Sequence, residues 1–468
     1  MIPERLQPLV AETRPLADRF AALGFQLYLV GGVVRDAILD RLGDRTDLDF
    51  TTDAPPDDIE DILRPWADAV WLQGKRFGTI GAKRDGRTYE ITTHRAEAYA
   101  PDSRKPDVQF SQSIEADLSR RDFTVNAMAL RLTPASGAGG LGDELELVDP
   151  HEGVVDLATG RLRTPLSPDE SFTDDPLRML RAARFLSGYS LKPDADLVDA
   201  VHRLHGRLEI VSAERIRDEL DKLMVVPNPS DGLWFLTATG LAGEFLPELP
   251  ALGLEQDPIH RHKDVLAHTI AVVEKTSPDR ILRLAALFHD VGKPKTRSIG
   301  AHGVSFHHHE VVGARITRDR MRALRYAVED IEAVTRLVEL HLRFHTYKMG
   351  WTDSAVRRYV RDAGPLLDEL NELTRCDCTT RNQRRADELG RRMDDLEARI
   401  AVLREQEELD AMRPDLDGRD VMDLLDVKPG RVIGEALAFL LELRMEEGPL
   451  GREEAQIRLK DWWATRPT

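Results

Sequence analysis

Strand-forming sequence is confined to the first third of this chain, and that asymmetry restricts its fold more than any other feature. Short apolar runs bounded by glycine, proline or charged residues predict strands in this part. They lie at Gln26–Val30, Leu48–Thr52, Gly78–Ala82, Thr88–Thr92 and Asn126–Leu130. Amphipathic spacing predicts helices at Arg5–Gly24 and Val33–Leu42. This first part of the chain is therefore expected to form a mixed α/β unit.

After Pro150 the pattern changes to helical spacing, which continues almost to the end of the chain. The helices predicted there are Ser167–Gly188, Ser212–Met224, Val265–Thr276, Pro278–Val291, Ala327–Leu342 and Gln383–Leu409. A glycine-rich stretch, Ala135–Gly140, predicts a loop at the transition. The expected fold class is α+β, with a mixed sheet and its helices first, followed by an all-helical body and tail.

The composition limits the functions that such a chain can have. Its 468 residues suffice for two or three domains. The 65 basic and 82 acidic residues give a net charge of −17, which excludes a protein that coats nucleic acid by charge alone. The cysteines, Cys376 and Cys378, argue for a reducing compartment and against a cysteine-built zinc site. Since there is no signal-peptide pattern and no run of ~20 apolar residues, we expect a cytoplasmic protein without a membrane partner.

Two aspartates on one predicted strand form the first candidate site. Residues two apart on a strand point to the same face, so Asp47 and Asp49 converge while Leu48 and Phe50 face the core. Such a carboxylate pair suits two Mg²⁺ ions that bridge nucleotide phosphates and activate an attacking hydroxyl. Glu90, on another predicted strand, is the candidate for a third carboxylate. For the Asp-x-Asp pattern alone, a solvated strand edge is the alternative.

A double glycine precedes this pair of aspartates. The segment Leu29-Val-Gly-Gly-Val-Val-Arg-Asp36 ends a strand at Gly31 and Gly32 and then opens a helix. Such a turn lets backbone N–H groups approach a phosphate closely. By itself the pattern also fits a plain turn, because turns use glycine anyway.

Together these residues resemble the class II nucleotidyltransferases of the polymerase-beta superfamily, which include bacterial CCA-adding enzymes and bacterial poly(A) polymerases. The resemblance implies that Gly31, Gly32, Arg35 and Asp36 hold a nucleoside triphosphate, and that Asp47 and Asp49 bind two Mg²⁺ ions. The segment Ser119-Arg-Arg-Asp-Phe-Thr-Val-Asn-Ala127 is similar to the family's second motif, which implies contacts with the nucleotide. The residues concerned are Arg120, Arg121, Asp122 and Asn126.

A later segment resembles the family's base-reading motif. It runs Asp174-Asp-Pro-Leu-Arg-Met-Leu-Arg-Ala-Ala-Arg-Phe185 and contains Asp175, Arg178, Arg181 and Arg184. Asp175 and Arg178 are expected on one face of a helix, where one offers acceptors and the other donors to the Watson–Crick edge of cytosine or adenine. An ordinary i, i+3 salt bridge is the alternative. The family commonly has Glu-Asp where this chain has Asp174 and Asp175.

A cluster of histidines between His260 and His345 forms the second candidate site. Imidazoles and carboxylates from separate helices can make a divalent-metal site. A His-Asp pair that ends an apolar helix before Val291-Gly-Lys-Pro294 resembles the HD phosphohydrolase superfamily. The resemblance implies the ligands His268, His289, Asp290 and Asp377, with His309 and His341 as candidates for extra ligands or phosphate contacts. The implied chemistry is attack of metal-activated water on a phosphate ester.

These resemblances predict template-independent addition of C, C and A to the 3′ end of tRNA from CTP and ATP, with release of pyrophosphate. They also imply HD-type phosphatase and 2′,3′-cyclic phosphodiesterase activity. The segment Gly74-Lys-Arg-Phe-Gly-Thr-Ile80 resembles the CCA-adding version rather than the poly(A) version. Poly(A) synthesis, CC-only addition, A-only addition and an HD phosphohydrolase with a nucleotide-binding head stay open as alternatives. The expected partners are tRNA, CTP and ATP, and the oligomeric state is left open.

The same motifs divide the chain into four parts. These are a nucleotidyltransferase head at residues 1–150, a helical neck with the base-reading motif at 151–225, an HD-type helical domain at 226–400 and a helical tail at 401–468. Asp149-Pro-His-Glu-Gly-Val-Val-Asp-Leu157 resembles the hinge between head and neck, and Glu214-Arg-Ile-Arg-Asp-Glu219 resembles the last neck motif. The implied cofactors are Mg²⁺ in the head and a divalent metal, of unspecified identity, at the HD site.

Overall fold

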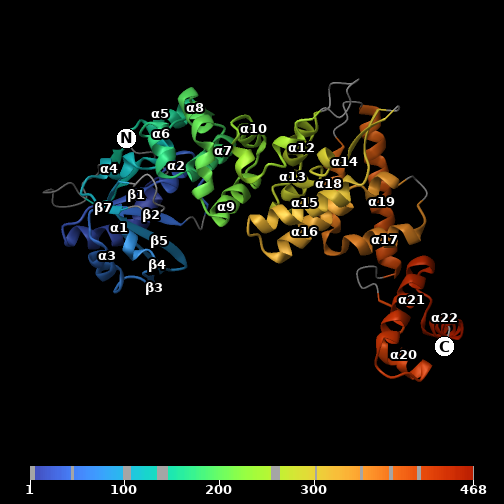
Figure 1. The fold of residues 1–468 in the computed structure, drawn as a ribbon. Helices are drawn as coiled ribbons and strands as arrows, with labels where there is room; N and C mark the ends of the chain where they lie inside the picture. The colour runs from blue at the N-terminus through green and yellow to red at the C-terminus, as the bar shows by residue number, and fades with distance from the viewer. Residues whose placement is uncertain are drawn as a thin grey trace. The chain divides into compact units, whose positions relative to one another are not determined.

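The chain forms two compact units, Met1–Phe245 and Leu246–Thr468, and each is described by itself. The computed structural model describes residues 6–43, 47–98, 107–133, 146–254, 264–300, 303–347, 351–378, 383–407 and 413–466. The predicted loop Ala135–Gly140 lies outside these ranges. A mixed sheet with its helices comes first in the chain and a mostly helical part follows (Figure 1), so the predicted α+β class is confirmed.

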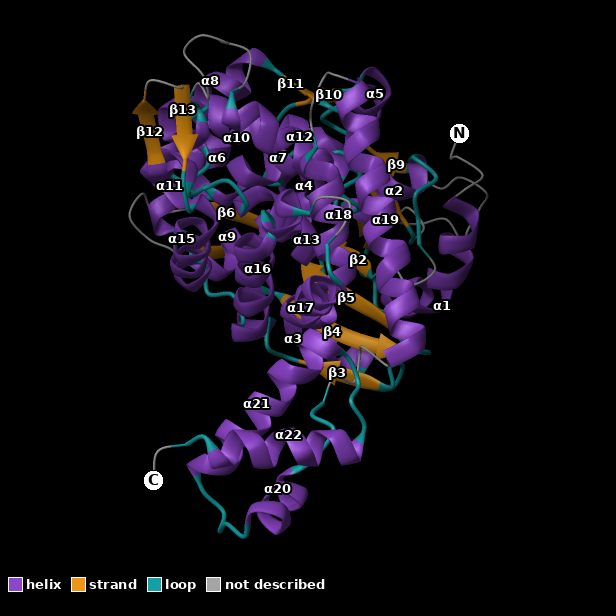
Figure 2. Ribbon diagram, turned by 90° about the vertical axis from the view of Figure 1, so that its right-hand side faces the viewer, coloured by secondary structure: helices purple, strands orange, loops and turns teal. Residues whose placement is uncertain are grey.

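The first unit is built on a seven-stranded sheet with the order β3-β4-β5-β2-β1-β8-β9. Its strands are β1 (Leu27–Val30), β2 (Leu48–Thr52), β3 (Ala69–Trp71), β4 (Thr79–Arg84), β5 (Arg87–Thr93), β8 (Ala129–Arg131) and β9 (Leu147–Val148). The neighbours β2 and β5 are parallel, whereas β1 and β2 are antiparallel. A separate two-stranded ribbon joins β6 (Arg95–Ala98) and β7 (Asp107–Phe110). Figure 2 shows the strands in orange.

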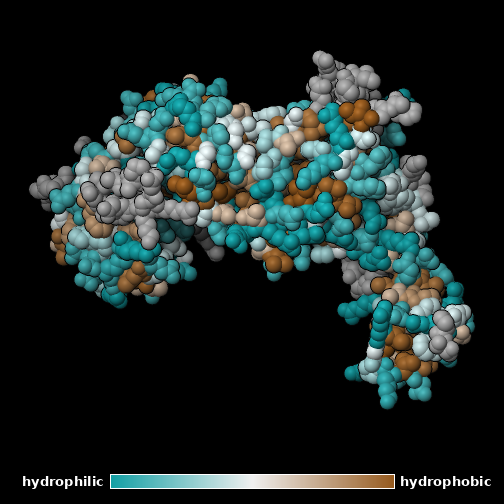
Figure 3. Space-filling view, viewed as in Figure 1, coloured by the Kyte–Doolittle hydropathy of each residue, from teal (hydrophilic) through white to brown (hydrophobic). Residues whose placement is uncertain are grey.

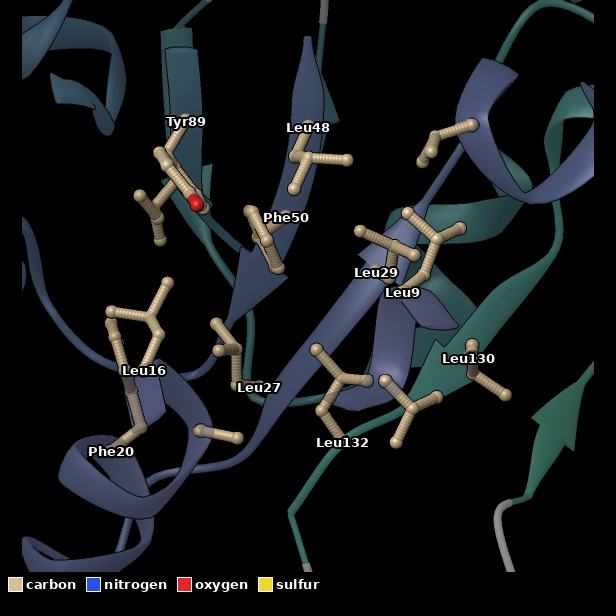
Figure 4. Packing of buried hydrophobic residues seen from close by; sticks show 14 of the residues in the cluster. Leu9, Leu16, Phe20, Leu27, Leu29, Leu48, Phe50, Tyr89, Leu130 and Leu132 are labelled. Atoms are coloured by element: carbon tan, nitrogen blue, oxygen red, sulfur yellow. The ribbon is translucent and has the colours of Figure 1, made fainter. Parts of the chain in front are cut away.

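One face of the sheet packs against α1 (Gln7–Ala22) and α3 (Pro56–Leu63). Phe20 of α1 belongs to the same buried cluster as Leu48 and Phe50 of β2 (Figure 4). The other face is partly covered by α4 (Ile114–Ser119), whose Leu118 packs with residues of β1. Because alternate side chains of a strand point to opposite faces, Asp49 of β2 lies on the face away from α1.

Two predicted elements of this unit differ from the structure. The strand expected over Asn126–Leu130 begins only at Ala129, because Thr124–Asn126 forms a 3₁₀ turn. The Asn126 amide donates to Asp122 within this turn, so local side-chain bonding replaces strand pairing there. The helix expected over Val33–Leu42 is shorter: α2 spans Gly32–Ile38, and Asp40 has a φ of 59°, which a helix does not accommodate.

A third difference concerns the base-reading segment. The single helix predicted over Ser167–Gly188 is two helices, α6 (Pro168–Asp174) and α7 (Leu177–Tyr189). Pro176 disfavours a helical conformation in the residue before it, and Asp175 is accordingly extended, with φ −137° and ψ 99°. The prediction that Asp175 and Arg178 share one helix face is therefore wrong.

Helices make up most of the remainder of the first unit. They are α5 (Gly153–Thr159), α8 (Ala195–Leu204), α9 (Ala213–Met224), α10 (Ser230–Ala238) and α11 (Leu241–Phe245). A short parallel pair, β10 (Arg161–Leu162) and β11 (Lys192–Pro193), lies among them, where the sequence indicated helices alone. Ser212 caps α9 by accepting a hydrogen bond from the Arg215 N–H, which fixes the predicted start of that helix.

The second unit is mostly helical. Its first helices are α12 (Val265–Lys275), α13 (Arg280–Phe288), α14 (Lys293–Thr296), α15 (His309–Ala323), α16 (Val328–Leu340), α17 (Asp353–Ala363) and α18 (Leu367–Asp377). They are followed by α19 (Gln383–Glu407), α20 (Gly418–Leu425), α21 (Arg431–Glu447) and α22 (Arg452–Ala464). A hairpin of β12 (Arg297–Gly300) and β13 (Gly303–Phe306) interrupts them, which the sequence did not predict.

The last three helices pack around a small apolar cluster of their own. Val421 of α20, Leu440 of α21 and Leu459 of α22 are buried together in it. Figure 3 shows apolar residues at the surface of these helices, among residues that are mostly hydrophilic. Within the described part of the chain, no helix is both long enough and apolar enough to cross a membrane.

Candidate functional site

The central strands of the sheet bring the predicted carboxylates of the head together. Asp49 of β2 and Glu90 of β5 are register partners on parallel neighbouring strands, so their side chains lie on the same face. Asp47 immediately precedes β2 and is exposed. In the described ranges, these three residues do not form a group whose ligand oxygens all lie within 4.8 Å of one another. The structure therefore shows a close pair, Asp49 and Glu90, with Asp47 at the start of the strand.

Asp49 has an unusual electrostatic environment. Water reaches its carboxylate, yet surrounding protein replaces much of its hydration, and this desolvation raises the pKa of Asp49 to about 6. The negative charge of Glu90 acts in the same direction, and that of Asp47 adds to it. The Arg121 guanidinium opposes the shift. An excess of negative charge that a single arginine does not compensate is the environment that a divalent cation favours.

The double glycine packs directly against two arginines. Gly31 has a φ of 73°, and a Cβ there would lie 3.1 Å from a terminal nitrogen of Arg121. A Cβ on Gly32 would lie 3.4 Å from a terminal nitrogen of Arg35. Glycine is therefore required at the first position by the backbone conformation, and at both positions it admits a guanidinium close to the main chain.

Arg35 is held in place from all sides and is 5% exposed. Its Nε donates to Asp36 Oδ1 at 2.9 Å, and other N–H groups donate to the Asn126 side chain and the Tyr189 hydroxyl. The Tyr189 ring lies beneath it, with 4.2 Å between the guanidinium carbon and the ring centroid. Tyr189 also donates to Asp36 at 3.1 Å, across 153 sequence positions. Tyr189 was not predicted as a site residue, and its only signal in the sequence is its position one turn after Phe185.

A chain of ion pairs continues from this point into helices α7 and α9. Asn126 donates to Asp122 at 2.9 Å, and Arg181 donates to the other oxygen of Asp122 at 2.7 Å. Burial alone would raise the pKa of Asp122, but the Arg181 charge and the Asn126 hydrogen bond outweigh it and hold that pKa well below its usual range. Arg184 and Arg181 both reach Glu219 of α9, which is 3% exposed. Glu219 lies in the segment that resembles the last neck motif.

The two arginines of the second motif, Arg120 and Arg121, converge on a buried aspartate that was not predicted as a site residue. Asp117, fully buried, accepts from Arg120 at 2.9 Å and from Arg121 at 3.1 Å. Burial raises the pKa of Asp117, but the two guanidinium charges outweigh this effect and lower it overall. The i, i+3 and i, i+4 spacing of Arg120 and Arg121 from Asp117, at the end of α4, was the available signal. Asp117 thus orients Arg121 toward Gly31 and Asp49.

The base-reading residues are engaged with protein groups in this structure. Arg178 donates to Ser171 Oγ at 2.8 Å and to the Arg120 carbonyl at 2.5 Å. Asp175 accepts from Arg215 of α9 at 2.8 Å. Arg178 thus lies next to a residue of the second motif, and Asp175 lies next to a residue of α9. The break between α6 and α7 positions the two side chains, and they do not share a helix face.

The HD residues of the second unit form one compact cluster. His268 Nε2 lies 3.2 Å from His289 Nε2 and 3.0 Å from Asp377 Oδ1. Asp290 Oδ1 lies 3.4 Å from His309 Nε2. The six predicted residues fall into two groups whose ligand atoms lie within 4.8 Å of one another. These groups are His268, His289 and Asp377, and Asp290, His309 and His341.

The donor atoms of this cluster fit divalent metal ions. His289, His309 and His341 each direct Nδ1 at a backbone carbonyl, at 2.7, 2.8 and 2.7 Å respectively, which leaves Nε2 free to bind a metal. Asp290 Oδ1, His309 Nε2 and His341 Nε2 are buried without a hydrogen-bond partner. Burial lowers the pKa of His341 to about 3, with the His289 charge acting in the same direction, so its imidazole is neutral. Buried polar atoms without partners that converge on one point are the expected pattern of a metal site.

Two further residues touch the cluster and were not predicted. Lys293 Nζ lies 2.6 Å from Asp290 Oδ2, and His345 Nε2 lies 3.6 Å from Asp377 Oδ2. Gly292, which precedes Lys293, lets the main chain pack closely against His309, because a Cβ at Gly292 would lie 2.1 Å from the His309 carbonyl oxygen. Lys293 lies in the quoted segment after the His-Asp pair, whereas His345 carries no local signal.

Comparison with protein families matches three parts of the chain. Residues 27–163 match a poly A polymerase head domain, and residues 265–403 match an HD domain. Residues 190–252 match a family described as a probable RNA and SrmB-binding site of polymerase A. The first match contains Asp47, Asp49 and Glu90, and the second contains the six residues of the HD cluster.

Similarity to whole proteins points in the same direction. An A-adding tRNA nucleotidyltransferase of Deinococcus radiodurans is 35% identical over 376 residues, which cover 77% of this chain and 82% of that protein. A CCA-adding enzyme of Limosilactobacillus reuteri is 36% identical over 239 residues, which cover 51% of this chain and about half, 55%, of that relative. The crystal structure of the Bacillus stearothermophilus CCA-adding enzyme in complex with CTP shares the fold, with a TM-score of 0.71 at 21% identity over 99% of both chains. This chain belongs to the tRNA nucleotidyltransferase family.

Proposed function

We propose that this chain adds C, C and A to the 3′ end of tRNA from CTP and ATP, without a nucleic-acid template, and releases pyrophosphate at each step. The observation that carries the proposal is the Asp49–Glu90 pair beside Arg121 and the Gly31 turn, since it combines carboxylates for cations with a guanidinium for a phosphate. Membership of the tRNA nucleotidyltransferase family supports the substrate class.

Asp47, Asp49 and Glu90 would hold Mg²⁺, which neutralises charge on the triphosphate and makes the attacking hydroxyl more acidic. In each addition the 3′-oxygen of the RNA forms a bond to the α-phosphorus of the incoming nucleotide. The bond from that phosphorus to the bridging oxygen of the β-phosphate breaks, pyrophosphate leaves and the hydroxyl proton passes to solvent. Arg121 lies where it can pair with the triphosphate, and Asp117 keeps its guanidinium oriented.

Arg35 and Asp36 have a different role in this proposal. Because Arg35 is 5% exposed and bonded to Asp36, Asn126 and Tyr189, it shapes the nucleotide site from within the protein. The pairs of Asp122 with Arg181 and of Glu219 with Arg184 extend that framework. Asp175 and Arg178 would read the base, and Arg120 would help to orient Arg178 through its carbonyl oxygen. Base reading requires Arg178 to exchange its bonds to Ser171 and Arg120 for bonds to the nucleotide.

A-only addition is the second candidate activity. It is favoured by the similarity to the A-adding enzyme of Deinococcus radiodurans, because the matched region covers 82% of that relative. Incubating the purified chain with labelled CTP and ATP on tRNA transcripts that end before CCA, after C and after CC separates the two activities. Growth of all three to full CCA supports the proposal, whereas extension only of the transcript that ends in CC supports A-only addition. Long A tails on unrelated RNA would instead identify a poly(A) polymerase.

We propose that the HD cluster is a metal-dependent phosphohydrolase that acts on nucleotides. The two groups of three ligands would hold two divalent ions, with His289 in one group and Asp290 in the other. Bound there, such ions lower the pKa of water and neutralise charge on phosphoryl oxygens. On a 2′,3′-cyclic diester, a water oxygen forms a bond to phosphorus, one ribose P–O bond breaks and the released ribose oxygen takes up a proton.

The two proposed activities can be tested independently. Asp49→Ala is expected to abolish nucleotide addition and to leave hydrolysis of 2′,3′-cyclic nucleotides intact, while His289→Ala is expected to do the reverse. Loss of both activities in either variant would contradict two separate sites. A wild-type chain that hydrolyses 2′,3′-cyclic nucleotides but adds no nucleotide to tRNA would identify the remoter alternative, an HD phosphohydrolase whose head only binds nucleotides. The proposal places the enzyme in the cytoplasm, since the free thiols Cys376 and Cys378 suit a reducing compartment.

A further inference from the structure

A cavity of about 220 Å³ lies in the second unit between the start of α19 and the segment that carries His345. Its lining includes Phe344, His345, Cys378, Leu389, Gly390 and Met393. The α19 residues in this wall recur at three- and four-residue spacing, so they form one face of that helix. Pockets for drug-sized ligands measure roughly 300–1,000 Å³. This cavity is smaller, and it suits a fragment with a single ring system.

The cavity lies next to the HD cluster. His345 lines the cavity, and its Nε2 lies 3.6 Å from Asp377 Oδ2. The other oxygen of Asp377 lies 3.0 Å from His268 Nε2, within the cluster. Cys378, the next residue in the chain, also lines the cavity. If the phosphate of a bound molecule lies at the HD cluster, the group attached to that phosphate can therefore reach the cavity.

The wall of the cavity is mostly apolar, and several of its polar groups are already bonded. Arg375 pairs with Asp394 and Glu397, each at 2.7 Å, and the Thr374 hydroxyl donates to the Leu370 carbonyl at 2.8 Å. Phe344 offers an aromatic surface in the wall, and Met393 a polarisable one. Such a wall binds a flat, aromatic group by stacking and dispersion.

We propose that this cavity is the base-binding subsite of the HD site, occupied by the nucleobase of the nucleotide whose phosphate is hydrolysed. The proposal rests on the proposed hydrolase function of the HD cluster. His345 and Cys378 are the polar side chains that remain to contact the edge of the base, so the site has few groups with which to distinguish one base from another. Purine and pyrimidine nucleotides are both expected as substrates.

Gly390 allows the subsite to be filled without damage to the fold. A Cβ at Gly390 meets no atom within 4 Å, and the residue lies on the helix face that lines the cavity. Gly390→Leu therefore places a side chain in the cavity, and it also removes a helix-interior glycine, which favours helix formation. Gly434→Leu is the matched control, because Gly434 lies within α21, is exposed and likewise has no atom within 4 Å of an added Cβ.

The first test compares substrates that share the reacting ring. The full chain is assayed with 2′,3′-cyclic AMP, with 2′,3′-cyclic UMP, and with glycerol 1,2-cyclic phosphate, which lacks a base. Gly390→Leu is expected to lower kcat/KM for both cyclic nucleotides by about tenfold or more and to leave the glycerol ester within about twofold. Gly434→Leu is expected to match the wild type. An equal loss for all three substrates, or no loss for any, would overturn the base subsite.

A second test does not depend on hydrolysis. Cys378 lines the cavity, whereas Cys376 does not, so alkylation of Cys376 in the same chain serves as the internal reference. Adenosine is expected to protect Cys378 of the full chain from alkylation by iodoacetamide, mapped by mass spectrometry, and Gly390→Leu is expected to remove that protection. An alkylation rate that adenosine leaves unchanged would overturn the subsite. If the wild type hydrolyses none of the three esters while protection persists, the proposed hydrolase fails and the base-binding cavity stands.

Discussion

Asp49 and Glu90 lie opposite each other on the parallel strands β2 and β5, so the sheet itself sets two carboxylates side by side. Lost hydration raises the pKa of Asp49 to about 6, and the Glu90 charge adds to the shift. The energetic cost of this proximity is removed when a cation binds, because the cation compensates the charge that the strands bring together. The same relationship makes the site sensitive to pH.

We expect nucleotide addition at limiting Mg²⁺ to fall as the pH drops through about 6. Asp49 must be ionised to bind Mg²⁺, and a proton competes for it once the pH approaches its raised pKa. Glu90→Gln removes a neighbouring negative charge, so the acidic limb of the profile should move to lower pH by about half a unit to one unit. Rates between pH 5 and 8 measure this shift. Glu12→Gln, which changes a carboxylate paired with Arg87, serves as the control. An acidic limb that stays in place in Glu90→Gln would contradict the coupling.

Tyr189→Phe is expected to lower kcat/KM for nucleotide addition by about tenfold. The change removes the hydroxyl that bonds Arg35 and Asp36, and a hydrogen bond to a charged group is worth about 1.5–3 kcal/mol. It keeps the ring beneath the guanidinium, so Tyr189→Ala should cost more than Tyr189→Phe.

Separate measurement of KM and kcat distinguishes this positioning role from simple destabilisation. If Tyr189 shapes the nucleotide site, KM for CTP and ATP should rise while KM for tRNA stays constant. Tyr326→Phe, a change at a buried tyrosine of the second unit, is the control for the loss of a hydroxyl. A Tyr189→Phe enzyme with wild-type constants would remove Tyr189 from the site.

The sequence was a good guide wherever local pattern decides structure. The bounds of β2 were predicted correctly because Leu48 and Phe50 are buried on one face while Asp49 is exposed on the other. The members of the HD cluster were implied by the resemblance to the HD phosphohydrolase superfamily, and the structure brings them together in two groups of three.

Contacts between distant segments could not be predicted in the same way. Nothing near Arg35 indicates that the Tyr189 ring lies beneath it, because packing of α2 against α7 creates that contact. The break at Asp175 was different in kind: Pro176 carried the signal, and helical spacing on both sides of the proline obscured it. The turn at Asn126 combines a local bond to Asp122 with a bond to Arg35, which is 91 positions away and comes close only in the assembled fold.

Asp122→Asn is expected to destabilise the first unit at neutral pH by about 3 kcal/mol. Removing one partner of a buried ion pair costs about 3–5 kcal/mol, and the lower end applies because Arg181 retains 30% exposure of its side chain. The difference from the wild type should be constant above about pH 5 and should shrink as the pH falls below about 4. The sign follows from a folded-state pKa below the unfolded value, since the unfolded chain then binds the proton first.

Hydrogen exchange of peptides from α7, followed by mass spectrometry in the full chain, measures this stability locally. Arg203→Gln breaks an exposed pair with Asp169 and should change exchange by far less. A difference between Asp122→Asn and the wild type that persists unchanged to pH 3 would show that Asp122 does not owe its contribution to its ionised state.

The arrangement of the HD cluster predicts a metal stoichiometry. If the two groups of ligands each hold an ion, equilibrium dialysis against Ni²⁺, which imidazole ligands favour, should give about two ions per chain. His309→Ala should remove about one ion, because it leaves the group of His268, His289 and Asp377 intact, and His268→Ala should remove about one from the other group. His202→Ala, at a histidine of α8, should remove none. A lower number of bound ions in Asp49→Ala would reveal an ion that binds in the head. Since His268 and His309 belong to the second unit, both of these variants should add nucleotides to tRNA at the wild-type rate. A single ion in the wild type, or two ions retained in His309→Ala, would show that His309 and His341 serve a purpose other than holding a second metal.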